Sequence, residues 1–185
     1  DANFTGSTSA TAPHTVNAAS TTTAIASDTP DPSVVGQAYT VSFTVTSAGG
    51  TPTGNVTVSD GAASCIGTVA APSCSLTSTT AGAKTLTATY AGDANFTGST
   101  SATAPHTVNA AATTTTIGTD LPDPSTVGQA YTVTWAVAVT APGAGTPTGN
   151  VTVSDGTGAT CAAAVAAGSC ELTSTTAGAK PLTAP

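Results

Sequence analysis

The residues that could carry chemistry in this chain are four cysteines, nine acids, two histidines and two lysines. The cysteines form two identical Cys-x8-Cys pairs, Cys65 with Cys74 and Cys161 with Cys170. A zinc site would need further thiol or imidazole ligands close by in the sequence, and none accompanies either pair. One disulfide in each pair is the better interpretation, and it predicts an oxidising, extracytoplasmic setting.

Most of the acids stand in turn sequences, where Asp ordinarily hydrogen-bonds to the local backbone. They are Asp28, Asp31, Asp60, Asp93, Asp120, Asp123 and Asp155. A Ca²⁺ site between domains that uses Asp28 and Asp31 is the alternative, but the spacing of an EF-hand loop is not present. We therefore expect neither a metal site nor a cofactor site.

The histidines and lysines each occupy equivalent positions of a repeat, which favours a structural role. His14 and His106 lie in identical segments, and Lys84 and Lys180 lie in identical Gly-containing turns, where a Lys–Asn cross-link is disfavoured. A Ser-His-Asp triad would need a nucleophile elbow such as Gly-x-Ser-x-Gly, and the sequence has no such motif. We expect no catalytic residue and no enzymatic activity.

The composition excludes several classes of partner. Only 6% of residues are charged, the net charge is −7, and Lys84 and Lys180 are the only cations apart from histidine. Nucleic acid binding needs a basic face that neutralises phosphates, so we expect no nucleic-acid partner. No apolar run approaches the ~18 residues of a transmembrane helix, so we expect no membrane insertion.

The elements that must position these residues form an internal repeat. Residues 1–19, DANFTGSTSATAPHTVNAA, return without change at residues 93–111. The second copy ends a long sequence of β type, whereas the first copy follows no such sequence. Residues 1–17 are therefore predicted to be the final strand of a domain, displaced to the front of the chain.

Alternation of apolar and polar residues predicts strands with one buried face. Residues 39–46 alternate cleanly, and residues 55–59 and 85–90 do the same. Residues 65–69 and 74–76 form a candidate hairpin that the first cysteine pair would cross-link. About seven strands in roughly ninety residues, with turns between them, are typical of an antiparallel β-sandwich. The expected core comprises Tyr39, Val41, Phe43, Val45, Leu86, Tyr90, Tyr131, Val133, Trp135 and Val137.

The pattern predicts three segments: 1–17 as an orphan final strand, 18–109 as a complete domain, and 110–185 as a domain that lacks its final strand. Pro185 aligns with Thr89, so three residues, the equivalents of 90–92, separate the end of one copy from the start of an identical one. Residues 1–17 of one unit are therefore expected to complete residues 110–185 of another.

The combined motifs resemble those of bacterial immunoglobulin-like tandem repeats found in large secreted and surface proteins. The motifs are SDTPDPSVVGQ, GTPTG-VTVSDG, the Cys-x8-Cys pair and TLTATYAGDANFTGS. The resemblance implies an all-β fold of tandem Greek-key sandwiches, seven strands each, in a permuted register, and an extracellular or cell-surface location. It carries no catalytic residues to transfer, and Pro181 and Pro185 depart from it where the first repeat has Thr85 and Thr89.

The function expected from this organisation is structural. We expect a repeat unit of an extracellular bacterial fibre or stalk whose partners are copies of itself, arranged head to tail. The joint would use Phe4, Ala12, His14 and Val16, either between separate subunits or within one long polypeptide. An adhesin or carbohydrate-binding module, and a spacer region of a secreted enzyme, are the alternatives. Glycans at the Asn-x-Thr sequons and host or cell surfaces are further candidate partners.

Overall fold

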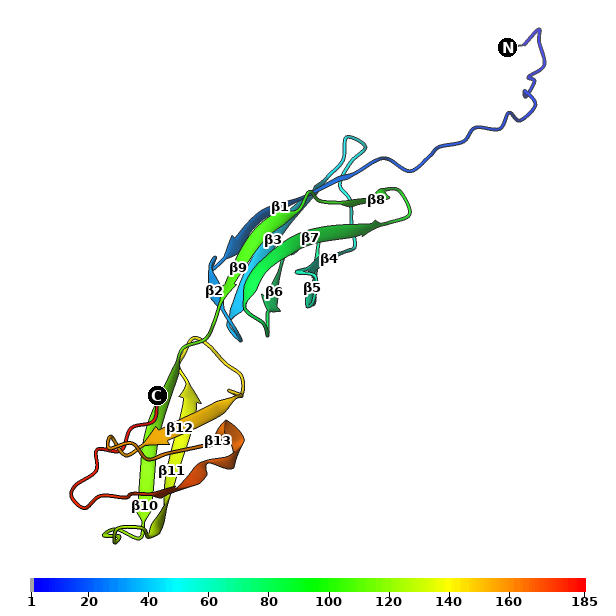
Figure 1. The fold of residues 1–185 in the computed structure, drawn as a ribbon. Coiled ribbons are helices and arrows are strands. Elements are labelled where there is room, and N and C mark those ends of the chain that lie inside the picture. The colour runs from blue at the N-terminus through cyan, green and yellow to red at the C-terminus, as the bar shows by residue number, and fades with distance from the viewer. Residues whose placement is uncertain (1) are drawn as a thin grey trace.

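The computed structural model describes residues 2–185 as two β-sandwiches that follow one another, with an N-terminal segment reaching away from the first (Figure 1). No α-helix occurs in this part of the chain, and the only helical element there is the 3-10 turn η1 (Val165–Ala167). The expected all-β fold is confirmed. No helix among the described residues is long and apolar enough to cross a membrane.

The first sandwich spans nine strands. They are β1 (Thr22–Thr29), β2 (Ser33–Val34), β3 (Ala38–Thr46), β4 (Asn55–Ser59), β5 (Ser64–Thr68), β6 (Ser73–Thr77), β7 (Gly82–Gly92), β8 (Thr97–Thr100) and β9 (Ala104–Asn109). One sheet has the order β1-β3-β6, and the other has the order β2-β9-β7-β4-β5, with β8 also paired to β7. Seven strands were expected; β2 and β8 are the short additions that the period-two pattern does not reveal.

The strand β2 explains how the first sandwich closes. It pairs in parallel with β9, while β1, immediately before it, pairs antiparallel with β3 of the other sheet. The chain therefore changes sheets within the Pro30-Asp31-Pro32 segment, where proline cannot donate to a ladder. As a result β9, the last strand of this sandwich, has a partner on each side.

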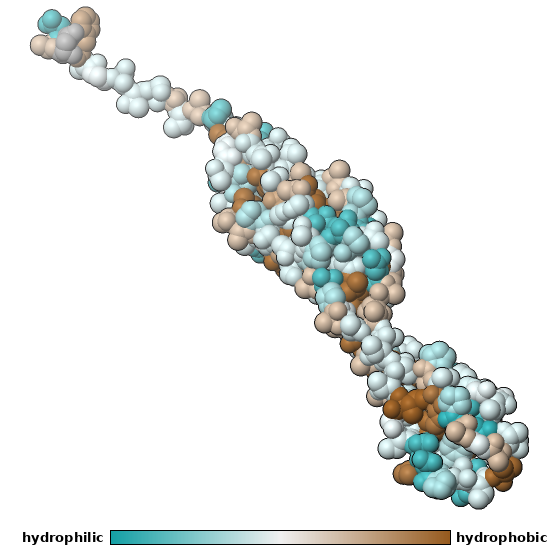
Figure 2. Space-filling view, turned by 90° about the vertical axis from the view of Figure 1, so that its left-hand side faces the viewer, coloured by the Kyte–Doolittle hydropathy of each residue, from teal (hydrophilic) through white to brown (hydrophobic). Residues whose placement is uncertain are grey.

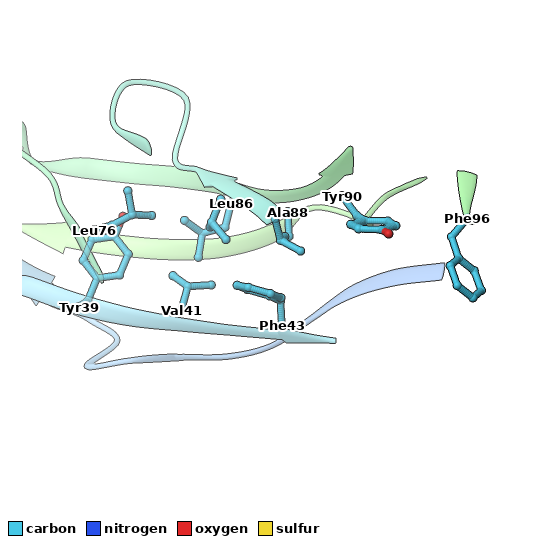
Figure 3. Close-up of a cluster of buried hydrophobic side chains, with 10 residues drawn as sticks. Tyr39, Val41, Phe43, Leu76, Leu86, Ala88, Tyr90 and Phe96 are labelled. Atoms are coloured by element: carbon cyan, nitrogen blue, oxygen red, sulfur yellow. The ribbon is translucent and has the colours of Figure 1, made fainter. Parts of the chain in front are cut away.

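The core lies between the two sheets, and alternation along the strands fills it. Tyr39, Val41 and Phe43 on β3 face Leu86 and Tyr90 on β7, all with at most 1% of their surface exposed (Figure 3). Val45, near the end of β3, is only half-buried. Burying such side chains stabilises a fold by about 1.5–3 kcal/mol each.

The disulfides join sheets rather than the two strands of a hairpin. Cys65 lies on β5 and Cys74 on β6, with Cα atoms 5.8 Å apart, and these strands are edges of opposite sheets. The expected hairpin is therefore wrong: β5 pairs with β4, and β6 pairs with β3. Alternation locates a strand but not the sheet it joins, because pairing partners lie far away in the sequence. Cys161 and Cys170 form the equivalent bond, with Cα atoms 6.0 Å apart.

The second sandwich repeats only part of this architecture. Its strands are β10 (Thr113–Leu121), β11 (Ala130–Val139), β12 (Asn150–Ser154), β13 (Thr160–Ala164) and β14 (Ser169–Thr173). The sheet β10-β11-β14 matches β1-β3-β6, but the opposite sheet consists of β12-β13 alone. In the described chain no strand of this sandwich takes the places of β8 and β9.

The second sandwich retains one pairing of the strand that corresponds to β7. Thr183 forms an isolated antiparallel bridge with Ser154, which matches the pairing of Thr87 with Ser59 in the first sandwich. The segment before this bridge, residues 178–182, has no strand conformation. Its counterpart in β7 pairs with β9, so the absence of that neighbour accounts for the irregular backbone.

The junction between the sandwiches is a direct backbone contact. The amide of Ala144 donates to the carbonyl oxygen of Val35, 3.0 Å away. Ala144 belongs to a turn that carries a three-residue insertion relative to the first repeat. The backbone of Ala144 also lies against Gly36, at a position where a Cβ atom would collide with it.

Candidate functional site

The polar centre of the first sandwich is His106, which β9 places inside the fold. Its ring stacks on that of Tyr39, with centroids 3.9 Å apart and planes inclined by 16°. Nδ1 lies 2.7 Å from Oδ2 of Asp28, and Nε2 lies 2.8 Å from Oγ of Ser33. The neighbouring Thr107 amide donates to Asp31, so β9 is fixed both by its side chain and by its backbone.

These contacts have the order of a Ser-His-Asp triad, which the sequence did not reveal. Nδ1 must carry a proton because an ionised Asp28 can only accept, and Nε2 is then free to accept from the Ser33 hydroxyl. Ser33 is 0% exposed and His106 is 1% exposed. A nucleophile closed off from solvent in this way has no room for a substrate, so the geometry supports a structural network.

The carboxylates of Asp28 and Asp31 also converge on His106. One potential ligand atom from each residue lies within 4.8 Å of the others. The imidazole nitrogens are, however, already engaged by Asp28 and Ser33 at hydrogen-bonding distance. The two acids expected either in turns or at a junction metal site thus act here as acceptors for β9.

A second hydrogen-bond network joins Tyr39, Ser78 and Asp60 in the first sandwich. The Tyr39 hydroxyl and the Ser78 hydroxyl both donate to Oδ2 of Asp60. Burial works to raise the pKa of the Asp60 carboxyl, but the hydrogen bonds from Ser78 and the Ala63 amide outweigh it and lower the pKa. Burial also raises the pKa of Tyr39. Asp60, expected to be a turn residue, therefore connects loops of both sheets.

The second sandwich has the equivalent of the Tyr39–Ser78–Asp60 network. The hydroxyl groups of Tyr131 and Ser174 are 3.0 Å apart, and Ser174 donates to Asp155 over 2.7 Å. That hydrogen bond, with those from Thr157 and the Ala159 amide, lowers the pKa of the Asp155 carboxyl to about 2 against the effect of burial. The strands that position this network, β11, β12 and β14, are thus all present in the second sandwich.

The described part of the second sandwich lacks a counterpart of His106, the central residue of the first network. Asp120, Asp123, Ser125 and Tyr131 correspond to Asp28, Asp31, Ser33 and Tyr39, each 92 positions later. All four line a cavity of about 600 Å³, together with Lys180, Leu182 and neighbouring residues. Ser125 is exposed, whereas its counterpart Ser33 is buried. In the described chain no imidazole stacks on Tyr131.

The rim of this region is apolar. Leu121 and Val127 are 62% and 58% exposed, which is unusual for large aliphatic side chains. Figure 2 shows brown, apolar patches on the second sandwich, at the end of the molecule away from the N-terminal segment. Val127 lines the cavity, and Leu121 lies between its lining residues Asp120 and Pro122 in the sequence.

The expected inter-unit strand lies outside both sandwiches. Phe4, Ala12, His14 and Val16 are all exposed. Phe4 is 75% exposed and Val16 is 83% exposed, whereas their counterparts Phe96 and Val108 are 8% and 2% exposed. Figure 1 shows this segment extending away from the first sandwich. Ala19, which follows the segment, forms a parallel bridge with Phe96 of that sandwich.

Two further groups of residues were named from the sequence: the expected core of the second sandwich, and Lys84. Tyr131, Val133 and Trp135 are buried in the second core, and Val137 is half-buried. The buried indole nitrogen of Trp135 has no hydrogen-bond partner among the described residues, a feature absent from the first core, where Phe43 takes this place. Lys84 lies in β7 rather than in a turn, and its ammonium group donates to Thr80.

The family comparison concerns the first sandwich. Residues 25–109 match the family model of the bacterial Ig-like domain (group 3). The first sandwich belongs to this family. The bacterial Ig-like domain thus spans β1 to β9, including the strand that carries His106. No curated protein matches the chain.

A likeness to solved structures accompanies this match. Structures of Clostridium thermocellum CbhA fibronectin(III)-like modules share 19% identity with the chain, with a TM-score of 0.38. The alignment covers 71% of this chain and 68% of that one. Bacterial Ig-like domains are typically non-catalytic modules of secreted or surface proteins. The two disulfides agree with such a location because thiols are kept reduced in the cytosol.

Proposed function

We propose that this chain is a structural unit of an extracellular or cell-surface bacterial fibre or stalk, assembled head to tail. Residues 1–17 of one unit supply the last strands of the second sandwich of the next unit. The single observation that carries the proposal is a match between two parts of the molecule. Among the described residues, the second sandwich has no counterpart of β8 and β9, and the exposed N-terminal segment repeats the sequence of β8 and β9 exactly.

The pairing that the first sandwich shows defines the expected joint. There β9 pairs antiparallel with β7, with His106 opposite Lys84 and Val108 opposite Gly82. The same register would place His14 opposite Lys180 and Val16 opposite Gly178. Backbone hydrogen bonds along such an added strand supply affinity, as in other strand-addition assemblies.

Burial of apolar surface favours this joint further. Phe96 and Val108 show how deeply the two largest apolar side chains of the segment are buried when the strand is in place. Moving the Phe4 and Val16 side chains from solvent to such positions would contribute about 1.5–3 kcal/mol each. The segment is otherwise rich in Ala, Ser and Thr, so the ladder and the polar contacts must contribute most of the remainder.

The arrangement of the chain suits a linear assembly. The N-terminal segment leaves one end of the molecule, and the second sandwich lies at the other (Figure 1). A heterologous contact between opposite ends, repeated, produces an open filament unless the rotation closes a ring. In a longer polypeptide of the same repeats, the identical strand would be supplied by the continuing chain.

Sedimentation velocity over a concentration series tests the proposal on the 185-residue chain. We expect the intact chain to form a series of oligomers, and a variant that lacks residues 1–17 to stay monomeric. Circular dichroism of both proteins checks that the deletion leaves the sandwiches folded. Equal sedimentation of the two proteins at every concentration would contradict strand exchange between units.

A further inference from the structure

The side chain that decides how a strand fits the second sandwich can be identified by comparing the two domains, if the proposed function is taken as the basis. In the first sandwich the largest polar side chain that β9 buries is His106, with 1% of its surface exposed. It contacts a phenol ring, a hydroxyl group and a carboxylate at once. The strand is therefore held by a specific polar group as well as by its ladder.

The second sandwich presents the complementary set without the imidazole. Tyr131 is the aromatic platform, Ser125 is the hydroxyl group, and Asp120 and Asp123 are the carboxylates. They line one cavity of about 600 Å³, which is large enough for several side chains. Two carboxylates beside an exposed hydroxyl group favour a ligand that donates hydrogen bonds, and the aromatic face favours one that is planar.

The chain contains one further histidine that meets this description. His14 is exposed on the N-terminal segment, and residues 12–17 repeat residues 104–109 without change. Its neighbours Pro13 and Thr15 are thus the same as those that flank His106. The imidazole would be presented by the same local sequence that already fits such a site once in this molecule.

We propose that His14 of a second copy enters the cavity of the second sandwich and acts as the residue that sets the register of strand insertion. Its ring stacks on Tyr131, its Nδ1–H donates to Asp120, and its Nε2 engages the hydroxyl group of Ser125. The Thr15 amide donates to Asp123, as the Thr107 amide does to Asp31.

One side chain must fix the pairing register of the inserted strand, because the other residues of the segment do not distinguish one register from another. The residues that share a strand face with His14 are Ala12 and Val16, which are both apolar, and a slip by two residues would keep the same face inward. Such a slip would place Ala12 or Val16 over Tyr131 and leave Ser125 and Asp120 covered without a partner. Covering a polar group without a hydrogen bond costs about 1–3 kcal/mol, more for a charged group. Only the register with His14 in the cavity avoids this cost.

The association of the intact 185-residue chain, measured by sedimentation velocity, tests this role through a double-mutant cycle. Because His14 lies on an exposed extension, His14→Ala leaves both sandwiches folded. We expect His14→Ala to weaken association at least tenfold and Ser125→Ala to weaken it about threefold to tenfold. The double variant should be no weaker than His14→Ala alone, because both changes remove one contact. Thr15→Ala, whose counterpart Thr107 is exposed, serves as the control and should change association less than twofold.

The outcomes separate this inference from the proposed function. If His14→Ala associates like Thr15→Ala, or if the two effects multiply in the double variant, the role of His14 is wrong. The strand-exchange function stands in either case, provided that deletion of residues 1–17 abolishes association. If the intact chain is monomeric, or if the deletion changes nothing, both proposals fail together.

Discussion

The ring of His106 lies 3.9 Å from the ring of Tyr39 and is nearly parallel to it, so that β9, the last strand of the first sandwich, places its buried imidazole in a polar network. Asp28 and Ser33 complete this network from the segment in which the chain changes sheets. Early and late parts of the domain therefore meet at one buried side chain. The first sandwich contains all four residues of this network, whereas the described part of the second contains the counterparts of Asp28, Ser33 and Tyr39 without the histidine.

Replacement of His106 should destabilise the first sandwich. His106→Ala removes the stacking contact and leaves the buried Ser33 and the half-buried Asp28 without their partner. We expect a loss of about 2–4 kcal/mol in the free energy of unfolding, measured by urea denaturation followed by circular dichroism. Thr107→Ala changes the exposed neighbour and should stay within about 0.5 kcal/mol of the unchanged protein. Similar losses for both variants would show that the network contributes little.

The second sandwich should lose stability in acid through Asp155. The pKa of this carboxyl is about 2 in the fold and 3.8 without its contacts. The ionised form therefore stabilises the fold above about pH 4, and this contribution disappears as the pH falls toward 2. Trp135, the single tryptophan, lies in the second core, so its fluorescence in urea titrations reports on this sandwich.

Asp155→Asn is the matched variant for the acid experiment. It removes the titrating group and should flatten the pH dependence between pH 4 and pH 2, at the cost of lower stability at neutral pH. An Asp155→Asn protein whose stability falls with pH as steeply as that of the unchanged chain would show that other carboxyls dominate.

The junction between the sandwiches should depend on Gly36. This residue has a φ of +79°, and a Cβ atom would meet the backbone of Ala144; Gly128, its counterpart, has a φ of +81° and open space around it. Both Gly→Ala changes carry the same backbone strain, about 1 kcal/mol, but only Gly36→Ala also disturbs the junction. We expect Gly36→Ala to speed hydrogen exchange at the Ala144 amide, measured by NMR, while Gly128→Ala leaves it unchanged. Equal rates in the two variants would contradict a rigid junction.

Each disulfide should stabilise its sandwich by joining edge strands of opposite sheets. The cysteines of each pair are nine positions apart, and closing a loop of that length contributes about 2–3 kcal/mol on the chain-entropy model. Replacing Cys161 and Cys170 together by serine should lower the stability reported by Trp135 fluorescence by that amount. The same change at Cys65 and Cys74 is the control, because it should leave the Trp135 signal nearly unaltered.

The sequence alone indicated the strands but not how they are distributed between sheets. Alternation at residues 39–46 marked β3 because one face of that strand is buried, and this signal is local. The hairpin expected at Cys65 and Cys74 was wrong because sheet membership depends on distant partners, β4 and β3. The two-residue strand β2 is too short for any periodic pattern.

The polar networks were the part that sequence reasoning missed. Asp60 and His106 have the sequence context of turn and surface residues, and nothing local shows that Tyr39 brings them together. One signal was available: the acids, the serine and the tyrosine recur in the second repeat, whereas the histidine recurs only at position 14, ahead of the first.

The central claim, that residues 1–17 of one copy pair with residues 178–182 of another, is tested most directly by cross-linking. In the first sandwich Thr107 is the partner of Ala83, so Thr15 should stand opposite Ala179 of another copy. One protein carrying Thr15→Cys is mixed with another carrying Ala179→Cys under mild oxidation, and the products are separated by non-reducing electrophoresis. We predict a covalent dimer of these two proteins and none when Pro13→Cys, two positions out of register, replaces Thr15→Cys. Absence of the dimer, or equal yields at both positions, would contradict the account.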